Sequence, residues 1–168
     1  MTGGLYLEGV RPAGVVGDYL GGPLRYDRNV NYELYMGAAL AEARAAADAG
    51  EAADGAVAVL DEAMVARGRS AIATTGDPTA HAVIIVVREA ARRLGRTKLS
   101  GLIVFTAVEP CAMCVGALIE SDVDGLVFAT PDAKSGASGS IAKGHLSVVS
   151  GIMAREAAEL RLTSARGH

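Results

Sequence analysis

The sequence predicts an α/β sandwich, in which helices cover a mainly parallel or mixed sheet. Two short apolar segments, residues 101–108 and 125–129, are predicted to be buried strands, and the segment between them is predicted to be a helix. This order of strand, helix and strand favours crossover connections within one sheet. The length of 168 residues and the hydrophobic fraction of 51% fit a single domain with a sizeable core.

The first 31 residues are the least regular part of the chain. They contain seven of its 21 glycines, together with scattered tyrosines, leucines and valines that favour burial. We expect an irregular arm that lies over the domain or over a neighbouring subunit, with a disordered tail as the alternative. The segment lacks the charged start and apolar centre of a signal peptide. Residues 32–168 form the predicted domain.

The other elements follow from periodicity and from residues that start or stop helices. Residues 83–94 are predicted to be helical despite a β-branched run over 83–87, because helical residues continue to Gly95. The remaining predictions are a helix over 32–48, strands over 56–60 and 63–66, a helix over 110–121, a polar loop over 131–143 and a helix over 152–162. No apolar run reaches the roughly 18 residues that a membrane span needs.

One imidazole and two thiols make the strongest chemical signal in the chain. His81 lies upstream of Cys111 and Cys114, whose spacing is C-x-x-C. These are three zinc ligands of the right types, and three protein ligands leave the fourth tetrahedral position open for water or substrate. A redox pair of cysteines and an ordinary helix histidine are the plainer alternatives.

Both ligand segments look like the first turn of a helix. Asp77 is predicted to be an N-cap with Pro78 at the first helical position, and Pro110 is predicted to take the same position ahead of Cys111. The positive end of a helix dipole favours thiolate and neutral imidazole, which are the protonation states that a metal needs. The two cysteines would share one helix face.

With these motifs, the chain resembles the zinc-dependent cytidine deaminase superfamily, and within it the branch of tRNA adenosine and guanine deaminases. The resemblance spans roughly residues 32–162 and is carried by residues 77–82, 109–114 and 132–137. The superfamily signature is H-x-E with P-C-x-x-C. The resemblance implies a three-layer α/β/α sandwich with a central mixed sheet of about five strands. It also implies that Zn²⁺ is held by His81, Cys111 and Cys114.

The chain departs from that signature at one position. The family's glutamate, which carries protons between the zinc-bound water, the ring nitrogen and the leaving amine, falls at Val83. Ser70 stands where the resembled enzymes usually carry a substrate-binding asparagine, and a hydroxyl cannot copy a carboxamide. The resemblance also places Ala82 and Asp132 at substrate-binding positions. Glu109 is a candidate substitute acid or base, although capping or orienting the backbone suits it as well.

The charge balance argues against a nucleic acid partner. The formal net charge is −3 and the pI is near 5.6, whereas phosphate binding draws mainly on Lys and Arg. One basic cluster fits either RNA phosphates or a solvated helix face: Arg88, Arg92, Arg93, Arg96 and Lys98. Both cysteines belong to the motif, so the composition suits a reducing cytoplasm without structural disulfides.

Three functional hypotheses follow. In the first, the protein deaminates a small heterocyclic amine such as an aminopurine or aminopyrimidine, and Val83 is an engineered change or is offset by another group. Losing a positioned acid or base typically costs about 10²–10⁴-fold, so activity would be very weak. In the second, the protein is a non-catalytic partner of an active deaminase paralogue, since the structural subunit of the eukaryotic tRNA adenosine deaminase also resembles it in carrying valine. In the third, zinc hydroxide serves a different reaction.

The resemblance also implies a homodimer that packs near the active site. The second ligand helix is apolar and compatible with such packing, through Val115, Ala117, Leu118 and Ile119. We expect no membrane partner.

Overall fold

The computed structural model describes residues 30–164, so nearly all of the predicted irregular arm and the last four residues lie outside the described part. The elements in chain order are α1 (Tyr32–Asp48), β1 (Gly55–Leu60), β2 (Ala63–Arg69), α2 (Ile72–Thr75), α3 (Ala82–Leu94), β3 (Ile103–Val108), α4 (Ala112–Glu120), β4 (Gly125–Thr130), α5 (Ser138–Ile141), β5 (Ser147–Ser150) and α6 (Ala154–Ser164). No helix within residues 30–164 is long and apolar enough to cross a membrane.

A five-stranded mixed sheet forms the centre of the fold. Its strand order is β2-β1-β3-β4-β5. β1 pairs antiparallel with β2 and with β3, whereas β3, β4 and β5 run parallel to one another. The parallel strands are joined by crossovers through α4 and α5, and the first of these is the strand–helix–strand unit that the sequence predicted.

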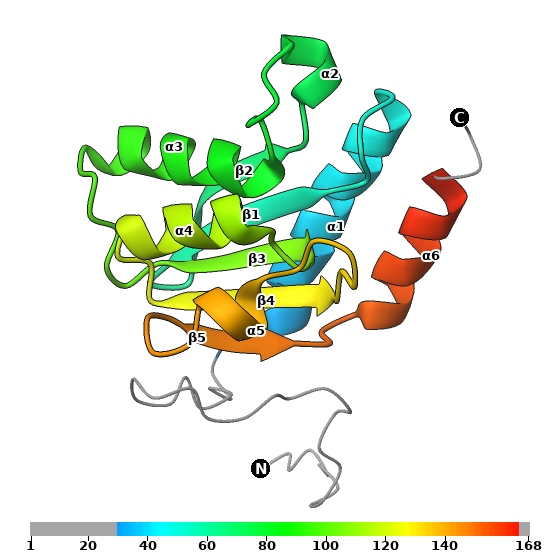
Figure 1. Cartoon of the computed structure of the whole chain (residues 1–168). Helices are drawn as coiled ribbons and strands as arrows, with labels where there is room; N and C mark the ends of the chain where they lie inside the picture. Colours follow the sequence, from blue (N-terminus) through cyan, green and yellow to red (C-terminus); the bar gives the residue numbers. More distant parts are fainter. Residues whose placement is uncertain (1–29, 165–168) are drawn as a thin grey trace, which may run out of the picture.

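Helices cover both faces of this sheet, which confirms the three-layer α/β/α sandwich (Figure 1). Alternate residues of each strand enter two separate hydrophobic clusters. In β1, Ala56 and Ala58 pack toward α3 and α4, whereas Val57 and Val59 pack toward α1 and α6. Phe105 of β3 anchors the second cluster, since its ring centroid lies 5.9 Å from that of Tyr32 and 5.2 Å from that of Tyr35.

The predicted helix starts were wrong at both ligand segments. α3 begins at Ala82 with His81 as its N-cap, and α4 begins at Ala112 with Cys111 as its N-cap. Asp77 does not cap α3, because its Oδ1 accepts hydrogen bonds from the amide and hydroxyl of Thr79 in a turn before the helix. His81 and Cys111 therefore lie at helix N-termini as the N-cap residues, and Cys114 lies in the first turn of α4.

Three elements were not predicted, namely the short helices α2 and α5 and the short strand β5. The predicted polar loop over 131–143 was wrong at α5, which spans Ser138–Ile141. α2 lies in the segment that leads to His81. The buried carboxylate of Glu51 accepts the amides of Ala73 (3.1 Å) and Thr74 (2.6 Å), and these bonds hold the pKa of Glu51 below its usual value. The Ala71 amide also donates to the Ala80 carbonyl at 3.0 Å, so the chain is fixed on both sides of this loop before it reaches His81.

Candidate metal centre

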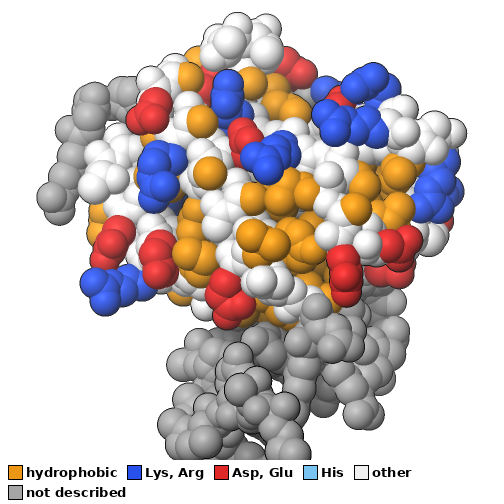
Figure 2. Space-filling model, turned by 180° about the vertical axis from the view of Figure 1, so that it is seen from behind, with side chains coloured by type: hydrophobic (Ala, Val, Ile, Leu, Met, Phe, Trp, Pro, Cys, Tyr) orange, Lys and Arg blue, Asp and Glu red, His pale blue; other side chains and the backbone are white. Residues whose placement is uncertain are grey.

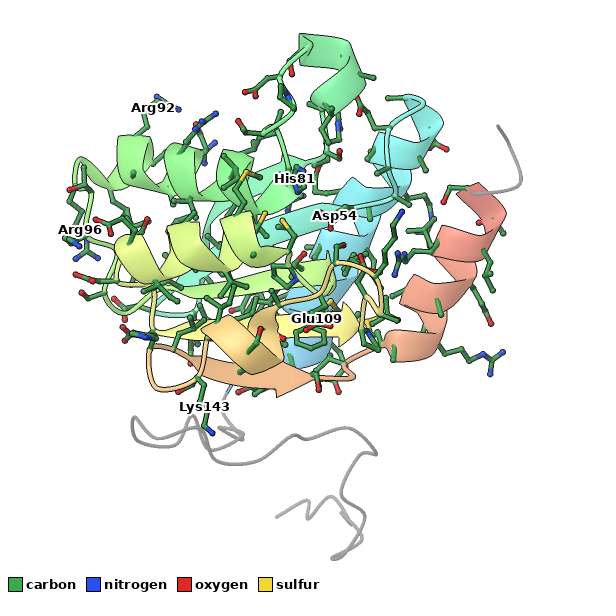
Figure 3. All side chains as sticks on the ribbon, in the orientation of Figure 1. Asp54, His81, Arg92, Arg96, Glu109 and Lys143 are labelled. Atoms are coloured by element: carbon green, nitrogen blue, oxygen red, sulfur yellow. The ribbon has the colours of Figure 1, made fainter. Side chains whose placement is uncertain are left out.

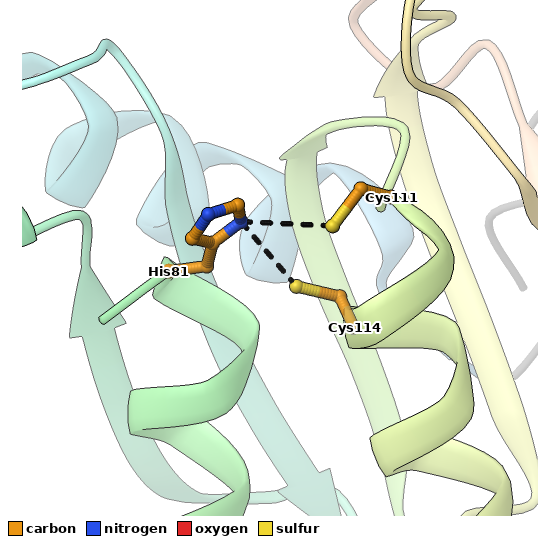
Figure 4. A group of neighbouring side chains, drawn as sticks. All are labelled: His81, Cys111 and Cys114. Atoms are coloured by element: carbon orange, nitrogen blue, oxygen red, sulfur yellow. Dashed lines mark hydrogen bonds between the residues drawn. The ribbon is translucent and has the colours of Figure 1, made fainter. Parts of the chain in front are cut away.

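The three predicted metal ligands come together between the N-termini of α3 and α4 (Figure 4). His81 Nδ1 lies 3.7 Å from Cys111 Sγ and 3.6 Å from Cys114 Sγ. All three ligand atoms lie within 4.8 Å of one another. His81 and Cys111 are partly exposed, whereas Cys114 is buried. Within residues 30–164, this is the only group of three His, Cys, Asp or Glu side chains that could hold a metal ion.

The spacing of these atoms fits a tetrahedral zinc ion. Zinc binds histidine nitrogen at about 2.0–2.1 Å and cysteine sulfur at about 2.3 Å, so a nitrogen and a sulfur at a tetrahedral angle lie about 3.6 Å apart. The distances from His81 Nδ1 to the two sulfurs, 3.7 and 3.6 Å, match this value. The donor set of one nitrogen and two sulfurs is also one that zinc prefers, and it supplies three of four ligands. His81, Cys111 and Cys114 could therefore hold a catalytic type of zinc.

The pKa of the buried Cys114 thiol indicates how a bound cation would act at this site. Burial, with the neighbouring Cys111 sulfur, raises the pKa of the Cys114 thiol well above its usual range. A coordinated cation has the opposite effect, because it stabilises the thiolate directly. Cys114 is consequently suited to bind a metal ion rather than to ionise on its own.

The metal ligands lie at one edge of the sheet, and the strand directions bring other polar residues to the same edge. β3 and β4 end there; Glu109 directly follows β3, and Asp132 lies two residues after β4. β1 runs antiparallel to β3 and begins at this edge, which places Asp54 there. β2 ends opposite the start of β1, which brings Ser70 beside Asp54.

Ser70 lies at this edge with an unused hydroxyl. Its amide donates to the Asp54 carbonyl at 3.0 Å, and the residue is only 3% exposed. Its Oγ is the one buried side-chain nitrogen or oxygen without a hydrogen-bond partner in the described part of the chain. A buried polar atom without a partner costs free energy, so it marks a place where a ligand or water completes the structure.

Ala82 and Val83, next to the ligand His81, are both buried. Their exposed fractions are 0% and 1%, and both belong to the cluster between the sheet and α3 and α4, together with Cys114. Position 83 therefore offers hydrocarbon and no titratable group. A substrate contact by Ala82 stays a prediction.

Glu109 points its carboxylate at the loop after β4. It accepts hydrogen bonds from the Asp132 amide (3.1 Å), the Ser138 amide (3.2 Å) and the Ser138 hydroxyl (2.6 Å). Asp132 in turn accepts hydrogen bonds from Ser135 and Lys134, which lower the pKa of its carboxyl, and lies 3.8 Å from Arg161. These contacts give Glu109 an anchoring role in the loop, while catalysis by Glu109 and substrate binding by Asp132 stay predictions.

Sequence analysis missed Asp54, the other carboxylate at this edge. Burial raises its pKa to about 7, although a hydrogen bond from Thr106 acts in the opposite direction. The available signal was an acidic residue directly before the apolar strand that begins at Gly55, but Asp124 precedes the strand at Gly125 in the same way. Nothing local distinguished Asp54 from a surface aspartate, because its partner Thr106 lies on β3, 52 residues along the chain.

Fold and site together define the class of this protein. A mixed sheet is flanked by helices, and His81 and Cys111 are the N-caps of two adjacent helices, with Cys114 in the first turn of the second. These three side chains could hold a zinc ion with one open position. The chain belongs to the family described as the cytidine and deoxycytidylate deaminase zinc-binding region, which its residues 29–130 match. This confirms the family that the motifs predicted, and His81, Cys111 and Cys114 could hold the zinc ion after which the family is described.

Known relatives include deaminases of tRNA and of a free base. The chain is 39% identical over 109 residues to a tRNA-specific adenosine deaminase of Bacillus subtilis, which covers 65% of this chain and 68% of the relative. It is 39% identical over 90 residues to a guanine deaminase of the same species, covering 53% and 58%. A chloroplastic tRNA(adenine(34)) deaminase of Arabidopsis thaliana is 39% identical over 114 residues, and the chain spans only 9% of its length.

The fold matches solved deaminase structures as well. One comes from a study of A-to-I editing by tRNA:A34 deaminases; its TM-score is 0.72 at 35% identity, over 76% of this chain and 98% of that chain. The guanine deaminase structure from Bacillus subtilis gives a TM-score of 0.59 at 35% identity, over 61% and 66%.

Proposed function

We propose that this protein is a zinc-dependent hydrolase that deaminates a small amino-substituted nitrogen heterocycle. The observation that carries the proposal is the ligand geometry: His81, Cys111 and Cys114 lie at zinc distances at one edge of the sheet. Membership of the deaminase family and similarity to adenosine and guanine deaminases support the same chemistry. When bound, Zn²⁺ lowers the pKa of its water to about 7, which supplies a nucleophile near neutral pH.

The residues around the ligands would bind and orient the heterocycle. The unused Ser70 hydroxyl can donate or accept one hydrogen bond at a ring nitrogen or oxygen. Glu109 holds the loop that carries Asp132 against the edge of the sheet, so this loop would line the substrate on the side of β4. These groups would suit a flat heterocycle that carries hydrogen-bonding nitrogen or oxygen atoms along the edge of its ring.

A small substrate fits the described surface better than the phosphates of RNA do. Most of the predicted basic cluster is paired with acidic residues: Arg88 with Asp77, Arg92 and Arg93 with Glu89, and Lys98 with Asp122. Arg96 donates instead to the Ser100 carbonyl. On the face shown in Figure 2, basic side chains likewise lie among acidic ones and form no continuous patch. Ion-paired charges release fewer counterions from a nucleic acid.

The valine at position 83 predicts a low rate of ammonia release. A buried valine cannot move protons, and a positioned acid or base contributes about 10²–10⁴-fold. We therefore expect slower ammonia release than in family members with the H-x-E signature. The same observation favours a second candidate, in which the protein is a non-catalytic partner of an active deaminase.

Ammonia release by the zinc-loaded protein tests the proposal. The panel holds adenine, guanine, cytosine, their nucleosides and aminotriazines, and it compares the unaltered chain with Val83→Glu and Val83→Gln. We expect slow release by the unaltered chain, an increase of 10²-fold or more in Val83→Glu, and no increase in the matched glutamine variant. Zinc-loaded, folded Val83→Glu that releases no ammonia from any compound would contradict the deaminase function. Turnover by the unaltered chain would exclude the non-catalytic role.

We also propose that the protein is a homodimer that packs through α4 and α5. The predicted contact residues Val115 and Leu118 are buried in the protein's own core and are not available to a partner. Met113 of α4 and Ile141 of α5 are instead exposed by 38% and 36%, and their helices lie side by side. Light scattering should give a dimer, and Met113→Asp with Ile141→Asp should give a monomer; an unaltered chain that is monomeric at micromolar concentration would contradict this.

A further inference from the structure

Three polar side chains lie side by side on three neighbouring strands at the metal-bearing edge of the sheet. Ser70 follows β2, Asp54 precedes β1 and Thr106 belongs to β3. The Ser70 amide donates to the Asp54 carbonyl at 3.0 Å, and Thr106 Oγ1 lies 3.3 Å from Asp54 Oδ1. Asp54 therefore occupies the centre of a polar row that runs across the strands.

This row faces the metal side of the sheet. Residues two apart on a strand share a face. Ala56 and Val104 belong to the cluster under α3 and α4, so Asp54 and Thr106 face the same way. A Cβ on Gly68 would meet side chains of α3, which gives Ser70 the same orientation.

The Asp54 carboxyl is also within electrostatic reach of the metal ligands. Its negative charge contributes to the raised pKa of Cys114. Figure 3 shows Asp54 and His81 at the same end of the sheet. Glu109 lies at this edge too, but its carboxylate already accepts three hydrogen bonds from the loop. Asp54 is thus a carboxyl at the metal-bearing edge whose charge reaches Cys114 and whose oxygens are not bonded to the loop after β4.

The hydrogen bonds around Asp54 suit a carboxyl that gains and loses a proton. The Thr106 hydroxyl has one hydrogen but two oxygen neighbours, Asp54 Oδ1 at 3.3 Å and the Val108 carbonyl at 3.1 Å. When Asp54 is protonated, it can donate to Thr106 Oγ1 while the Thr106 hydroxyl donates to the Val108 carbonyl, so both contacts are hydrogen bonds. When Asp54 is ionised, the hydroxyl can turn to donate to it. Among the charged neighbours, Arg161 favours the ionised form and Asp132 the neutral one.

We propose that Asp54 is the proton carrier of this site, in the role that Val83 cannot perform. The proposal rests on the deaminase function proposed above. Asp54 would face the ring nitrogen and the amine of the heterocycle, and the unpartnered Ser70 hydroxyl beside it would bind the same ring edge. Burial raises the pKa of Asp54 to about 7, which suits a group that must both take and give a proton near neutral pH.

The proton transfers balance with one carboxyl group. The Asp54 carboxylate takes a proton from water as the water oxygen bonds to the amine-bearing carbon, and it gives this proton to the adjacent ring nitrogen. It then takes the proton of the new hydroxyl and gives it to the amine. The carbon–nitrogen bond breaks, ammonia leaves and a carbonyl remains. Both hydrogens of water are accounted for, and the carboxylate is regenerated.

The test compares Asp54→Asn with Asp124→Asn, which removes the same charge from an exposed position after α4. Zinc content and Tm are measured first, and then ammonia release and the Kd for the panel base that the unaltered chain converts fastest. We expect Asp54→Asn to lower ammonia release 10²-fold or more and to weaken base binding at least tenfold, with zinc content unchanged. Asp124→Asn should change neither. Adding Val83→Glu to Asp54→Asn should restore ammonia release.

The outcomes separate this proposal from the proposed function. If Asp54→Asn releases ammonia as fast as the unaltered chain, Asp54 is not the proton carrier, while the deaminase function stands. The same holds if the unaltered chain is inactive and Val83→Glu alone is active. If neither the unaltered chain nor Val83→Glu releases ammonia with zinc bound, the deaminase function fails and the role of Asp54 fails with it.

Discussion

The Glu109 carboxylate and Ser138 are joined by two hydrogen bonds, since Oε1 accepts the Ser138 hydroxyl at 2.6 Å and the Ser138 amide at 3.2 Å. The other oxygen, Oε2, accepts the Asp132 amide at 3.1 Å. Glu109 directly precedes the Pro110-Cys111 pair, and the Ala137 amide donates to the Pro110 carbonyl at 3.0 Å. One carboxylate therefore ties the loop after β4 to the segment that carries the metal ligands.

Replacing Glu109 with Gln should loosen this loop. The side-chain amide keeps one acceptor oxygen but turns an NH₂ group toward backbone donors. Hydrogen bonds to a charged group contribute about 1.5–3 kcal/mol, so the free energy of unfolding should fall by roughly that amount. Urea denaturation measures the change, with the exposed Glu156→Gln on α6 as control. Equal stability of the two variants would show that the loop does not depend on this carboxylate.

Zinc should bind in a ratio of one ion per chain and should stabilise the fold. Metal analysis of the purified protein should give one zinc, and His81→Ala or Cys114→Ser should lower this content to near zero. A ligand present at about 100 times its Kd stabilises the folded state by about 2.7 kcal/mol, so chelation should lower Tm by several degrees. An unchanged zinc content in both variants, or an oxidised Cys111–Cys114 pair in the native protein, would contradict the metal centre.

Asp54 should make stability depend on pH in a defined direction. Its pKa is raised to about 7 in the folded protein, so between about pH 4 and pH 7 the unfolded chain releases this proton first. The folded state then holds more protons than the unfolded state, and stability falls as pH rises through this window. At about 1.4 kcal/mol per pKa unit, the loss reaches at most about 4 kcal/mol.

Subtracting the unfolding free energy of Asp54→Asn from that of the unaltered chain isolates this effect, because other groups titrate alike in both proteins. The difference should decrease from pH 4.5 to pH 7 and stay level up to pH 8.5. Parallel curves across the whole range would mean that Asp54 keeps an ordinary pKa.

Gly55, the residue after Asp54, should not tolerate a side chain. A Cβ at this position would overlap the backbone of α1 at Ala39 and Ala43. Gly55→Ala should therefore destabilise the protein by about 1–3 kcal/mol or more, as overpacking does. The control is Gly37→Ala on α1, where a Cβ meets nothing within 4 Å and the helix should gain about 0.5–1 kcal/mol. Thermal unfolding compares the two variants, and a neutral Gly55→Ala would contradict close packing of α1 on β1.

The sequence alone was sufficient wherever the signal was local. Alanine-rich periodicity placed α1 at residues 32–48 with the bounds that the structure has. The left-handed conformation of Gly95 ends α3 as expected, and the β-branched run over 83–87 is helical because α3 packs its buried face on β1 and β2. His81, Cys111 and Cys114 were found because ligand type and C-x-x-C spacing are read directly from the residues.

Only the tertiary structure decided which carboxylates serve the site. Glu109 stands beside a metal ligand in the sequence, but its bonds to Ser138 and Asp132 turn it toward the loop. Asp54 lies far from the ligands in sequence, and the antiparallel pairing of β1 with β3 brings it to their edge. A side chain's protonation and partners depend on burial and on neighbours from distant strands, and these do not exist until the chain has folded.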